Sequence, residues 1–448
     1  MVLAVGGTAV AAWRLWPEGP TPGSGRPNLI LISIDTLRAD HLGCYGYGRP
    51  TSPAIDALAD QGVRFERVMA QSPWTLPSHV SLVTGLYPHR NGVTTTRNKV
   101  DAGVPTLGGL LARAGYVSGA LTNSEWLTRR QGFDAGFSHF EYVSEFIGYN
   151  ITNVGAEITD KAIRWIKENE HQPFFLLVHY YDVHSDYEPE EPYRGMFVDP
   201  AYSGDINGRT PQLVQVRRGT RRIADDEVEH LVNLYDGEIR QLDDQIGRLL
   251  QFLERRGRAR DTYVVLVSDH GEEFMEHGGI LHGMTMYEEV IAVPLILRGP
   301  GIPAGVTVST LTQVVDVVPT ALGLLGVECD HTLDGIDLRD HWIPGGQAPR
   351  DRVAFAEADW RNAEPDIKRM VRTPRYKLIY DRHSHVRKLY DLQDDPGEKH
   401  NVAAKQQEVT NGLMRLLRAF QSGGREGQRV EPPSEETKKR LESVGYLF

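Results

Sequence analysis

The stretch TYVVLVSDHG (262–271) decides the fold, because it is an unbroken apolar run of strand length that ends in Asp269 and His270. A continuous apolar run of this length suits a strand that is buried on both faces of a mostly parallel sheet. The sequence contains four more such runs: NLILISID (28–35), GYVSGAL (115–121), PFFLLVHYYD (173–182) and VPLILRG (293–299). Together they predict a central sheet.

Segments with helical periodicity lie between these runs. In the longest of them, residues 226–255, leucine and isoleucine recur at helical spacing. Further helix candidates occupy residues 53–61, 78–84, 105–114 and 155–169. Alternation of strands and helices predicts an α/β domain over residues 27–344, in which helices flank a layered sheet.

The sequence changes character after about residue 345. VAFAEA, MVRTP, YKLIYD and KLYDL are short strand-like segments, and a helix candidate follows at 404–421. Residues 345–448 are therefore predicted to form a smaller C-terminal α+β domain built on an antiparallel sheet.

Residues 183–228 have no clear apolar period. Long connections without structure inside a compact domain are usually functional or disordered. This segment is expected to be either a lid over the substrate or a solvated surface insertion, and the sequence leaves both readings open.

Composition excludes several classes of protein. Among the 448 residues, 49 Lys and Arg stand against 60 Asp and Glu, and the net charge of −11 argues against nucleic acid as a standing partner. The two cysteines, Cys44 and Cys329, are too few for a disulfide scaffold or a cysteine-rich metal site. An anionic substrate would need local positive charge, most simply from a metal ion.

Residues 1–26 form an apolar N-terminal segment followed by a linker rich in proline and glycine. The apolar part, Val2 to Trp13, is too short for a membrane span, but it suits the apolar region of an export signal or the remainder of an anchor. We expect export, or anchoring on the outer side of the membrane through this segment, and a cytoplasmic location is the alternative.

Three of the apolar runs end in side chains that bind metals. The run 28–35 ends in Asp35, and the run 262–271 carries Asp269 and His270 near its end. The run 173–182 carries His179 and ends in Asp182, and His184 lies two residues later. In open α/β sheets the ligand site lies beyond the carboxyl ends of the strands. Asp35 alone is more typical of a turn, but two carboxylates at the ends of buried strands need a positively charged partner to compensate their charge. A divalent cation is the simplest such partner.

Thr75 is the candidate nucleophile. Pro77 suits the first turn of a helix and Gly85 suits its end, so the Thr75 hydroxyl is predicted to lie at a helix N-terminus. The amides and the dipole of that terminus favour an anion such as a phosphoryl or sulfuryl group. A simple N-cap is the alternative role for Thr75.

Several of these segments, in order, resemble the sulfatase family of the alkaline phosphatase superfamily, over residues 27 to 402. The resemblance implies the alkaline phosphatase-like fold, a metal site and an ester hydrolase. The matching motifs are IDTLRADHLGCYGYGRPTSPAIDALADQGVRFERV, TLPSHVSLVTGLYPHRNGV, VHYYDVHSDY, SDHGEEFMEHGGILHG, YEEVIAVPLILRGPG, VVDVVPTALGLLG and LYDLQDDPGEKHNVA.

The chain departs from the family pattern at the site itself. Family members with formylglycine carry the motif Cys-x-Pro-Ser-Arg or Ser-x-Pro-Ser-Arg. The aligned residues here run from Thr75 to His79 and read TLPSH, so Thr75 replaces the Cys or Ser and His79 replaces the Arg. Threonine is not converted to formylglycine, so none is expected. The family site usually begins with two adjacent aspartates and ends in Asp followed by Asn or Gln, whereas here Thr36 follows Asp35 and His270 follows Asp269. An imidazole ligand favours zinc or manganese over calcium.

The pattern is similar to that of phosphodiesterases and phosphonate hydrolases within the superfamily. It implies hydrolysis of a phosphoric diester or phosphonate monoester by double displacement, in which Thr75 attacks phosphorus and water hydrolyses the phosphothreonine. Asp35, Thr75, Asp269 and His270 are the expected metal ligands. His184 and His282, the latter at the position of a family lysine, are expected to act on the leaving group, or to form a second metal site with Asp182.

Two further histidines have less specific expectations. His277 suits orienting a loop as well as touching the substrate, and His179 is more typical of packing at a strand end than of a ligand.

Other functions remain open at this point. One is hydrolysis of a sulfuric ester by threonine without formylglycine, and another is transfer of a phospho-headgroup to a lipid or glycan. A binding module with a decayed site is a third. In each enzymatic case the expected partner is a small anionic ester, and the sequence gives no oligomeric state.

Overall fold

A nine-stranded sheet forms the centre of the computed structural model, which describes residues 25–143, 154–359 and 367–422, together with 424, 425, 427–430, 435 and 439. The strand order is β11-β2-β10-β7-β1-β6-β4-β5, and β12 pairs with β2. The strands are β1 (Asn28–Ile34), β2 (Val63–Met69), β4 (Val117–Thr122), β5 (His139–Tyr142), β6 (Phe174–Tyr180), β7 (Thr262–Ser268), β10 (Ala292–Arg298), β11 (Val306–Val308) and β12 (Thr312–Gln313).

The middle strands are buried on both faces, as their unbroken apolar sequences predict. β1 lies between β6 and β7 and runs parallel to both, with Leu29 opposite Phe175 and Tyr263. All residues of β1, β6 and β7 are buried. The predicted mostly parallel sheet is therefore confirmed, and β10, which is antiparallel to β7 and β2, is the exception.

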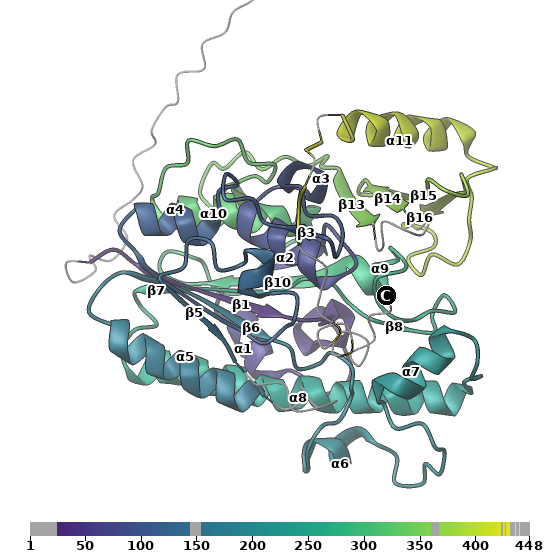
Figure 1. Cartoon of the computed structure of the whole chain (residues 1–448), viewed down its shortest axis with the longest axis horizontal. Helices are drawn as coiled ribbons and strands as arrows, with labels where there is room; N and C mark the ends of the chain where they lie inside the picture. The colour runs from purple at the N-terminus through teal and green to yellow at the C-terminus, as the bar shows by residue number, and fades with distance from the viewer. Residues whose placement is uncertain are drawn as a thin grey trace, which may run out of the picture.

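Helices cover both faces of this sheet (Figure 1). α1 (Pro53–Asp60), α5 (Gly155–Asn169) and α8 (Asp225–Arg255) lie below it in that view and share one apolar cluster with it. α2 (Thr75–Thr84), α4 (Leu107–Arg113) and α10 (Val317–Leu325) lie above it and belong to a second cluster. The predicted layered α/β architecture is confirmed.

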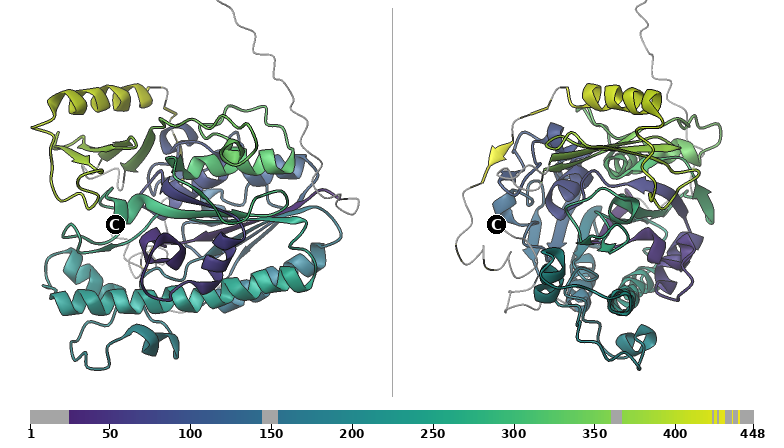
Figure 2. Two further views of the ribbon diagram at one scale, coloured as in Figure 1. Left: turned by 180° about the vertical axis from the view of Figure 1, so that it is seen from behind. Right: turned by 90° about the vertical axis from the view of Figure 1, so that its right-hand side faces the viewer.

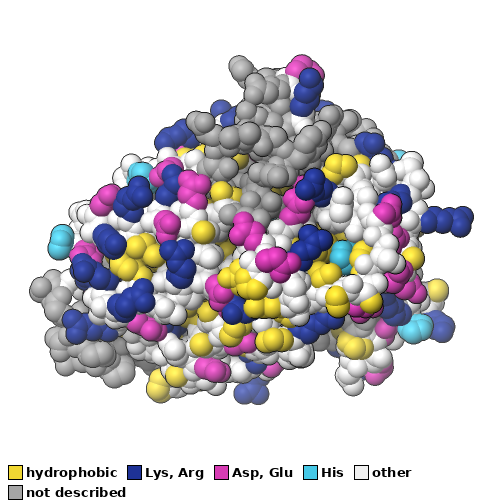
Figure 3. Space-filling view, turned by 90° about the horizontal axis from the view of Figure 1, so that it is seen from below, with side chains coloured by type: hydrophobic (Ala, Val, Ile, Leu, Met, Phe, Trp, Pro, Cys, Tyr) yellow, Lys and Arg dark blue, Asp and Glu magenta, His cyan; other side chains and the backbone are white. Residues whose placement is uncertain are grey.

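Several shorter elements complete the part of the structure that contains the central sheet. They are α3 (Pro88–Asn91), β3 (Asn98–Lys99), α6 (Tyr193–Phe197), α7 (Thr210–Arg217), β8 (Glu273–Phe274), β9 (Ile280–Leu281) and α9 (Glu288–Ile291), and β17 (Gln428–Arg429) pairs with β3. In Figure 3, which views the molecule from the side of α8, cationic and anionic side chains are interspersed. The positive charges of that face are therefore not gathered into one patch.

The C-terminal part forms a second, antiparallel sheet of four strands, as predicted. These are β13 (Ala354–Asp359), β14 (Ile367–Arg372), β15 (Tyr376–Asp381) and β16 (Arg387–Asp391). α11 (Gln407–Phe420) covers the outer face of this sheet, as the two views of Figure 2 show, through Leu413, Met414 and Leu417. The inner face belongs to the same apolar cluster as α2 and α10.

The segment 183–228 is not a structureless connection. It contains two helices, α6 and α7, of five and eight residues. Helices this short present too few turns for an apolar period to be legible in the sequence. α6 lies against α8 (Figure 1), and Arg217, the last residue of α7, donates a hydrogen bond to the backbone oxygen of His282. The segment therefore reaches the neighbourhood of the predicted site.

The apolar N-terminal segment lies outside the described residues. Within the part of the chain that the structure describes, no helix combines the length and the apolar character that crossing a membrane requires.

A buried lysine joins the C-terminal sheet to α9 of the preceding part of the chain, and its loss should destabilise the protein. Lys377 of β15 is fully buried, and its Nζ lies 3.1 Å from Glu288 Oε1 and 3.0 Å from Glu398 Oε1. Removing one partner of a buried ion pair leaves an uncompensated charge. Lys377→Met is expected to lower the free energy of unfolding by about 3–5 kcal/mol in denaturant titrations.

The matched control is the exposed Lys405, whose replacement by Met should change stability by less than about 0.5 kcal/mol. Equal stability of the Lys377→Met variant and the unmodified chain would show that the buried cluster does not hold the two parts together.

Candidate active site

The carboxyl ends of β1 and β7 and the first turn of α2 meet at one edge of the central sheet. β1 and β7 are parallel neighbours, so Asp35 and Asp269, the residues that follow them, lie side by side. Thr75, the first residue of α2, places its Oγ1 3.5 Å from Asp35 Oδ2 and 3.4 Å from His270 Nε2. All four side chains are fully buried. The structure thus brings together the four predicted metal ligands.

The orientation of these groups fits a cation. His270 Nδ1 donates to the Gly271 oxygen at 3.0 Å, which leaves the lone pair on Nε2. That nitrogen lies 3.5 Å from Asp35 Oδ1 and 3.3 Å from Asp269 Oδ2, and neither oxygen has a hydrogen-bond partner among the described residues. Three electron-rich atoms facing one another in a buried site repel, and a divalent cation would relieve that repulsion.

The electrostatics of the site lead to the same conclusion. Burial, and next the negative charge of Asp269, raise the pKa of Asp35 to about 6. Burial likewise raises the pKa of Asp269 to about 6 and lowers that of His270 to about 4. Without a cation, the protein therefore resists holding both carboxylates ionised. One oxygen from each carboxylate and one nitrogen of His270 all lie within 4.8 Å of one another.

Local backbone geometry explains two neighbours of the ligands. Gly271 follows His270 because a Cβ at this position would lie 2.1 Å from the Glu289 oxygen. Thr36 adopts a left-handed φ of 52°, which is strained for a β-branched residue, and its Oγ1 donates to the Val183 oxygen at 2.9 Å. The Thr36 hydroxyl therefore ties the loop after β1 to the loop after β6.

His79 supports Thr75, the candidate nucleophile, and was not assigned a role from the sequence. Its Nδ1 donates to the Thr75 backbone oxygen at 3.0 Å and lies 3.0 Å from Asp269 Oδ2, and its Nε2 accepts from the Ser33 hydroxyl at 2.8 Å. Burial lowers the pKa of His79 to about 4, so the ring is neutral. It therefore fixes the first turn of α2 against the ends of β1 and β7 without adding charge.

His179 both packs at a strand end and faces the ligands. Its ring lies edge-on to that of His79 at 4.8 Å, and its Nδ1 is hydrogen-bonded to Asn123 Oδ1 at 3.2 Å. The other nitrogen, Nε2, lies 3.5 Å from Asp35 Oδ2 and has no hydrogen-bond partner among the described residues. His179 thus borders the site from the side of β6.

His184 and His282 lie beside Asp35, Asp269 and His270, which form the candidate ligand group. The two rings are 4.9 Å apart, and the His282 ring is 4.5 Å from that of His270. Burial lowers the pKa of His184, and burial followed by the charge of Arg217 lowers that of His282 to about 3. The two neutral rings therefore continue the row of buried imidazoles that begins at His270.

Asp182 does not join these two histidines. Its Oδ1 accepts from the backbone N–H of Gly155 at 3.3 Å, at the start of α5. Among the described residues, Asp35, Asp269 and His270 form the one group of three or more metal-binding side chains whose ligand atoms are mutually within 4.8 Å. The arrangement of Asp182, His184 and His282 expected for a second metal is thus not assembled.

Glu272 and Arg217 hold His282 in place, and neither was singled out from the sequence. Glu272 is fully buried; its Oε1 accepts from His282 Nδ1 at 3.0 Å and its Oε2 from the Tyr187 hydroxyl at 2.9 Å. Arg217 Nη2 donates to the His282 backbone oxygen at 2.8 Å. A carboxylate on one ring nitrogen fixes the orientation of the imidazole and its tautomer.

His277 orients a loop. Its Nδ1 is bonded to Glu289 Oε1 at 2.5 Å and its Nε2 to the Glu398 oxygen at 3.1 Å, and its ring stacks on Tyr287 at 3.6 Å. With both nitrogens engaged, His277 supports the segment that leads to His282 and does not face the ligand group.

Comparisons with known proteins identify the family. The model of the family "Sulfatase" matches residues 27–327, and "N-sulphoglucosamine sulphohydrolase, C-terminal" matches residues 276–422. N-acetylglucosamine-6-O-sulfatase of Bacteroides thetaiotaomicron is 27% identical, over 88% of this chain and 86% of its own. Human arylsulfatase K is 25% identical, over 92% and 87%.

A solved structure of a different activity shares the fold. The phosphonate monoester hydrolase of Agrobacterium radiobacter superposes with a TM-score of 0.73 at 24% identity, covering 91% of this chain and 100% of its own. The family model alone spans more than half of the chain. With a buried group of two aspartates and a histidine beside a hydroxyl at a helix start, the chain belongs to the sulfatase family and is an ester-bond hydrolase.

Proposed function

We propose that the protein hydrolyses phosphoric esters, either diesters or phosphonate monoesters, with Thr75 as the nucleophile. The observation that supports this proposal is the position of Thr75 Oγ1, 3.5 Å from Asp35 and 3.4 Å from His270 at the start of α2. Asp35, Asp269 and His270 would hold zinc or manganese in preference to calcium, because one ligand is an imidazole. The bound cation would supply Lewis acidity and lower the pKa of the Thr75 hydroxyl.

The reaction would proceed in two displacements. First, Thr75 Oγ1 forms a bond to phosphorus while the bond from phosphorus to the leaving oxygen breaks, and that oxygen takes up a proton. Next, a water oxygen bonds to phosphorus, the bond to Oγ1 breaks and Thr75 regains its proton. The first N–H groups of α2 favour the negative charge of the transferring group.

His184 and His282 are assigned to the leaving group. They would position its oxygen, or protonate it once the negative charge of a bound substrate raises their lowered pKa. Glu272 would keep the His282 ring in the orientation that this task needs.

Hydrolysis of a sulfuric ester is the second candidate. It is favoured by the relatives, since N-acetylglucosamine-6-O-sulfatase and arylsulfatase K are named for that activity. We rank it lower because threonine has no route to formylglycine, and a sulfated threonine is expected to hydrolyse slowly.

One substrate panel separates the two candidates. Purified protein loaded with zinc, manganese or calcium would be assayed with nitrophenyl esters of sulfate, phosphate and methylphosphonate, and with a nitrophenyl phosphodiester. The proposal expects the highest kcat/KM for the diester or the phosphonate, with zinc or manganese. A kcat/KM for the sulfate above that of every phosphorus ester would overturn it.

Glu272 should matter most for poor leaving groups. Glu272→Gln removes the carboxylate that orients His282, so about a 10- to 100-fold loss of kcat is expected for an alkyl leaving group, which needs a proton. The loss should be small for nitrophenolate, which leaves without one. The matched control is Glu276→Gln, because Glu276 pairs with Arg38 and not with His282. Equal losses on both leaving groups would contradict the positioning role.

A further inference from the structure

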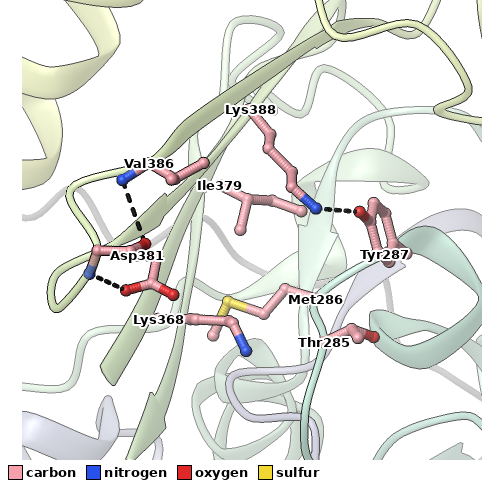
Figure 4. A pocket seen from close by; sticks show the side chains of 9 residues that line it. Thr285, Met286, Tyr287, Lys368, Ile379, Asp381, Val386 and Lys388 are labelled. Carbon is pink, nitrogen blue, oxygen red and sulfur yellow. Dashed lines mark hydrogen bonds between the residues drawn. The ribbon is translucent and has the colours of Figure 1, made fainter. Parts of the chain in front are cut away.

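We propose that the pocket between the loop after His282 and the C-terminal sheet binds the leaving alcohol and selects alcohols that carry an anionic group on an apolar body. This inference rests on the proposed function, because it names the substrate class of the same site. The pocket is shown in Figure 4 and has a volume of about 280 Å³. Its wall comes from two parts of the chain that are distant in sequence, the 285–287 segment and strands β14 to β16.

The lining combines apolar walls with two ammonium groups. Met286, Ile379 and Val386 supply aliphatic surface, and Tyr287 supplies an aromatic face. Lys368 of β14 and Lys388 of β16, the strands on either side of β15, extend toward the 285–287 segment. Apolar surface with a few polar groups is the usual composition of a small-molecule site. The body of a ligand here would be apolar.

The charge of the pocket favours an anion. Lys388 Nζ donates to the Tyr287 hydroxyl at 2.8 Å and lies 5.3 Å from the centre of that ring, and no carboxylate of the described residues pairs with it. The one acidic residue of the lining, Asp381, accepts from the backbone N–H groups of His383 and Ser384, both at 2.9 Å. Asp381 also lies opposite Lys368 in the strand register and interacts electrostatically with its ammonium group, so Lys388 is the cation that we assign to an anionic ligand.

The second lysine ties β14 to the loop that follows His282. Lys368 Nζ donates to the Met284 oxygen at 2.6 Å, and Arg217 Nη2 donates to the His282 oxygen at 2.8 Å. The loop that carries His282 is thus held by the C-terminal sheet and by α7. Thr285, the first lining residue, is three residues from His282, so their Cα atoms are at most about 11 Å apart.

A single substituted ring is the size of alcohol that we assign to this pocket. A leaving oxygen near His282 and an anionic substituent near Lys388 would place the apolar body of the alcohol along Met286 and Tyr287. A carboxylate is the simplest anion that the Lys388 ammonium can bind by a charge-assisted hydrogen bond. The chain as a whole has a net charge of −11, so this pocket attracts an anion locally and not through the overall field.

Matched leaving groups test the proposal on the whole chain. Two methylphosphonate esters would be compared, one of para-nitrophenol and one of meta-carboxy-para-nitrophenol, with the neutral carboxamide as a control for size. We expect KM for the carboxylated ester to be lower by about tenfold than for the carboxamide, and this preference to disappear in Lys388→Met. Lys388→Arg should retain the preference, and so should the exposed-site control Lys405→Met.

A second measurement does not depend on turnover. Calorimetric titration with free meta-carboxy-para-nitrophenol should show binding that is weakened about tenfold by Lys388→Met and not by Lys405→Met. Binding with this pattern, in a protein that hydrolyses none of the phosphorus esters, would leave the pocket standing and overturn the proposed function. Turnover of the phosphorus esters without any preference for the carboxylated leaving group would overturn the assignment of this pocket and would leave the proposed function intact.

Discussion

Thr75→Ala is expected to reduce kcat by about 10⁴-fold or more while the protein still binds its metal. The hydroxyl is the group that the proposed reaction bonds to phosphorus, and removal of a nucleophile costs rates of this order. Thr75 Oγ1 is 3.4 Å or more from its neighbours in the ligand group, so Asp35, Asp269 and His270 keep their mutual positions without it. Steady-state kinetics and metal analysis of the same preparation would measure both effects.

Thr75→Ser is the matched variant, because it restores a hydroxyl at the start of α2. It should retain activity within about 100-fold of the unmodified protein, since only a methyl group is lost. An alanine variant with near-native turnover would show that the nucleophile lies elsewhere. An alanine variant that loses its metal as well would make Thr75 an indispensable ligand, contrary to the three-residue group that we assign.

The fold followed from the sequence because its strongest signals are local. The runs that became β1, β6 and β7 are continuously apolar, and their burial on both faces requires such a pattern. The long helix α8 repeats its apolar residues over 31 positions, which makes its period plain. β2 was missed because it lacks the continuous apolar run of the middle strands. Its sequence, VRFERVM, includes three charged residues, and β2 is not buried along its whole length.

The ligand group was predictable for a topological reason. Asp35 and Asp269 each follow a strand, and the carboxyl ends of parallel neighbours meet at one edge. Asp182 also follows a strand, but its carboxyl group turns to the first N–H of α5. Position along the chain gives the edge of the sheet where a side chain lies, and it does not give the direction in which that side chain points.

The supporting residues were not predictable in the same way. Glu272 contacts Tyr187, which is 85 positions away, and Arg217 contacts His282 across 65 positions. These pairings depend on how α7 and the loops pack, and no local pattern encodes them. His79 carried a partial signal, because it occupies the place of a family arginine next to the nucleophile.

His270→Asn is expected to change which metal the site prefers. The variant replaces an imidazole nitrogen, 3.5 Å from Asp35 Oδ1 and 3.3 Å from Asp269 Oδ2, with an amide oxygen. Loss of the outer partner of a ligand costs about 10- to 100-fold in affinity, so loss of the ligand itself should weaken zinc and manganese binding by more than about 100-fold. Calcium prefers oxygen ligands and should lose much less.

Competition titrations with a metal indicator would give the three dissociation constants for each protein. His277→Asn is the control, because both nitrogens of His277 are bonded outside the ligand group, to Glu289 and to Glu398. If His270→Asn left the order of the three metals unchanged, His270 would not be a ligand. The repulsion between His270 Nε2 and the two buried carboxylates would then have to be relieved by protons. The lowered pKa of His270 opposes protonation of its ring.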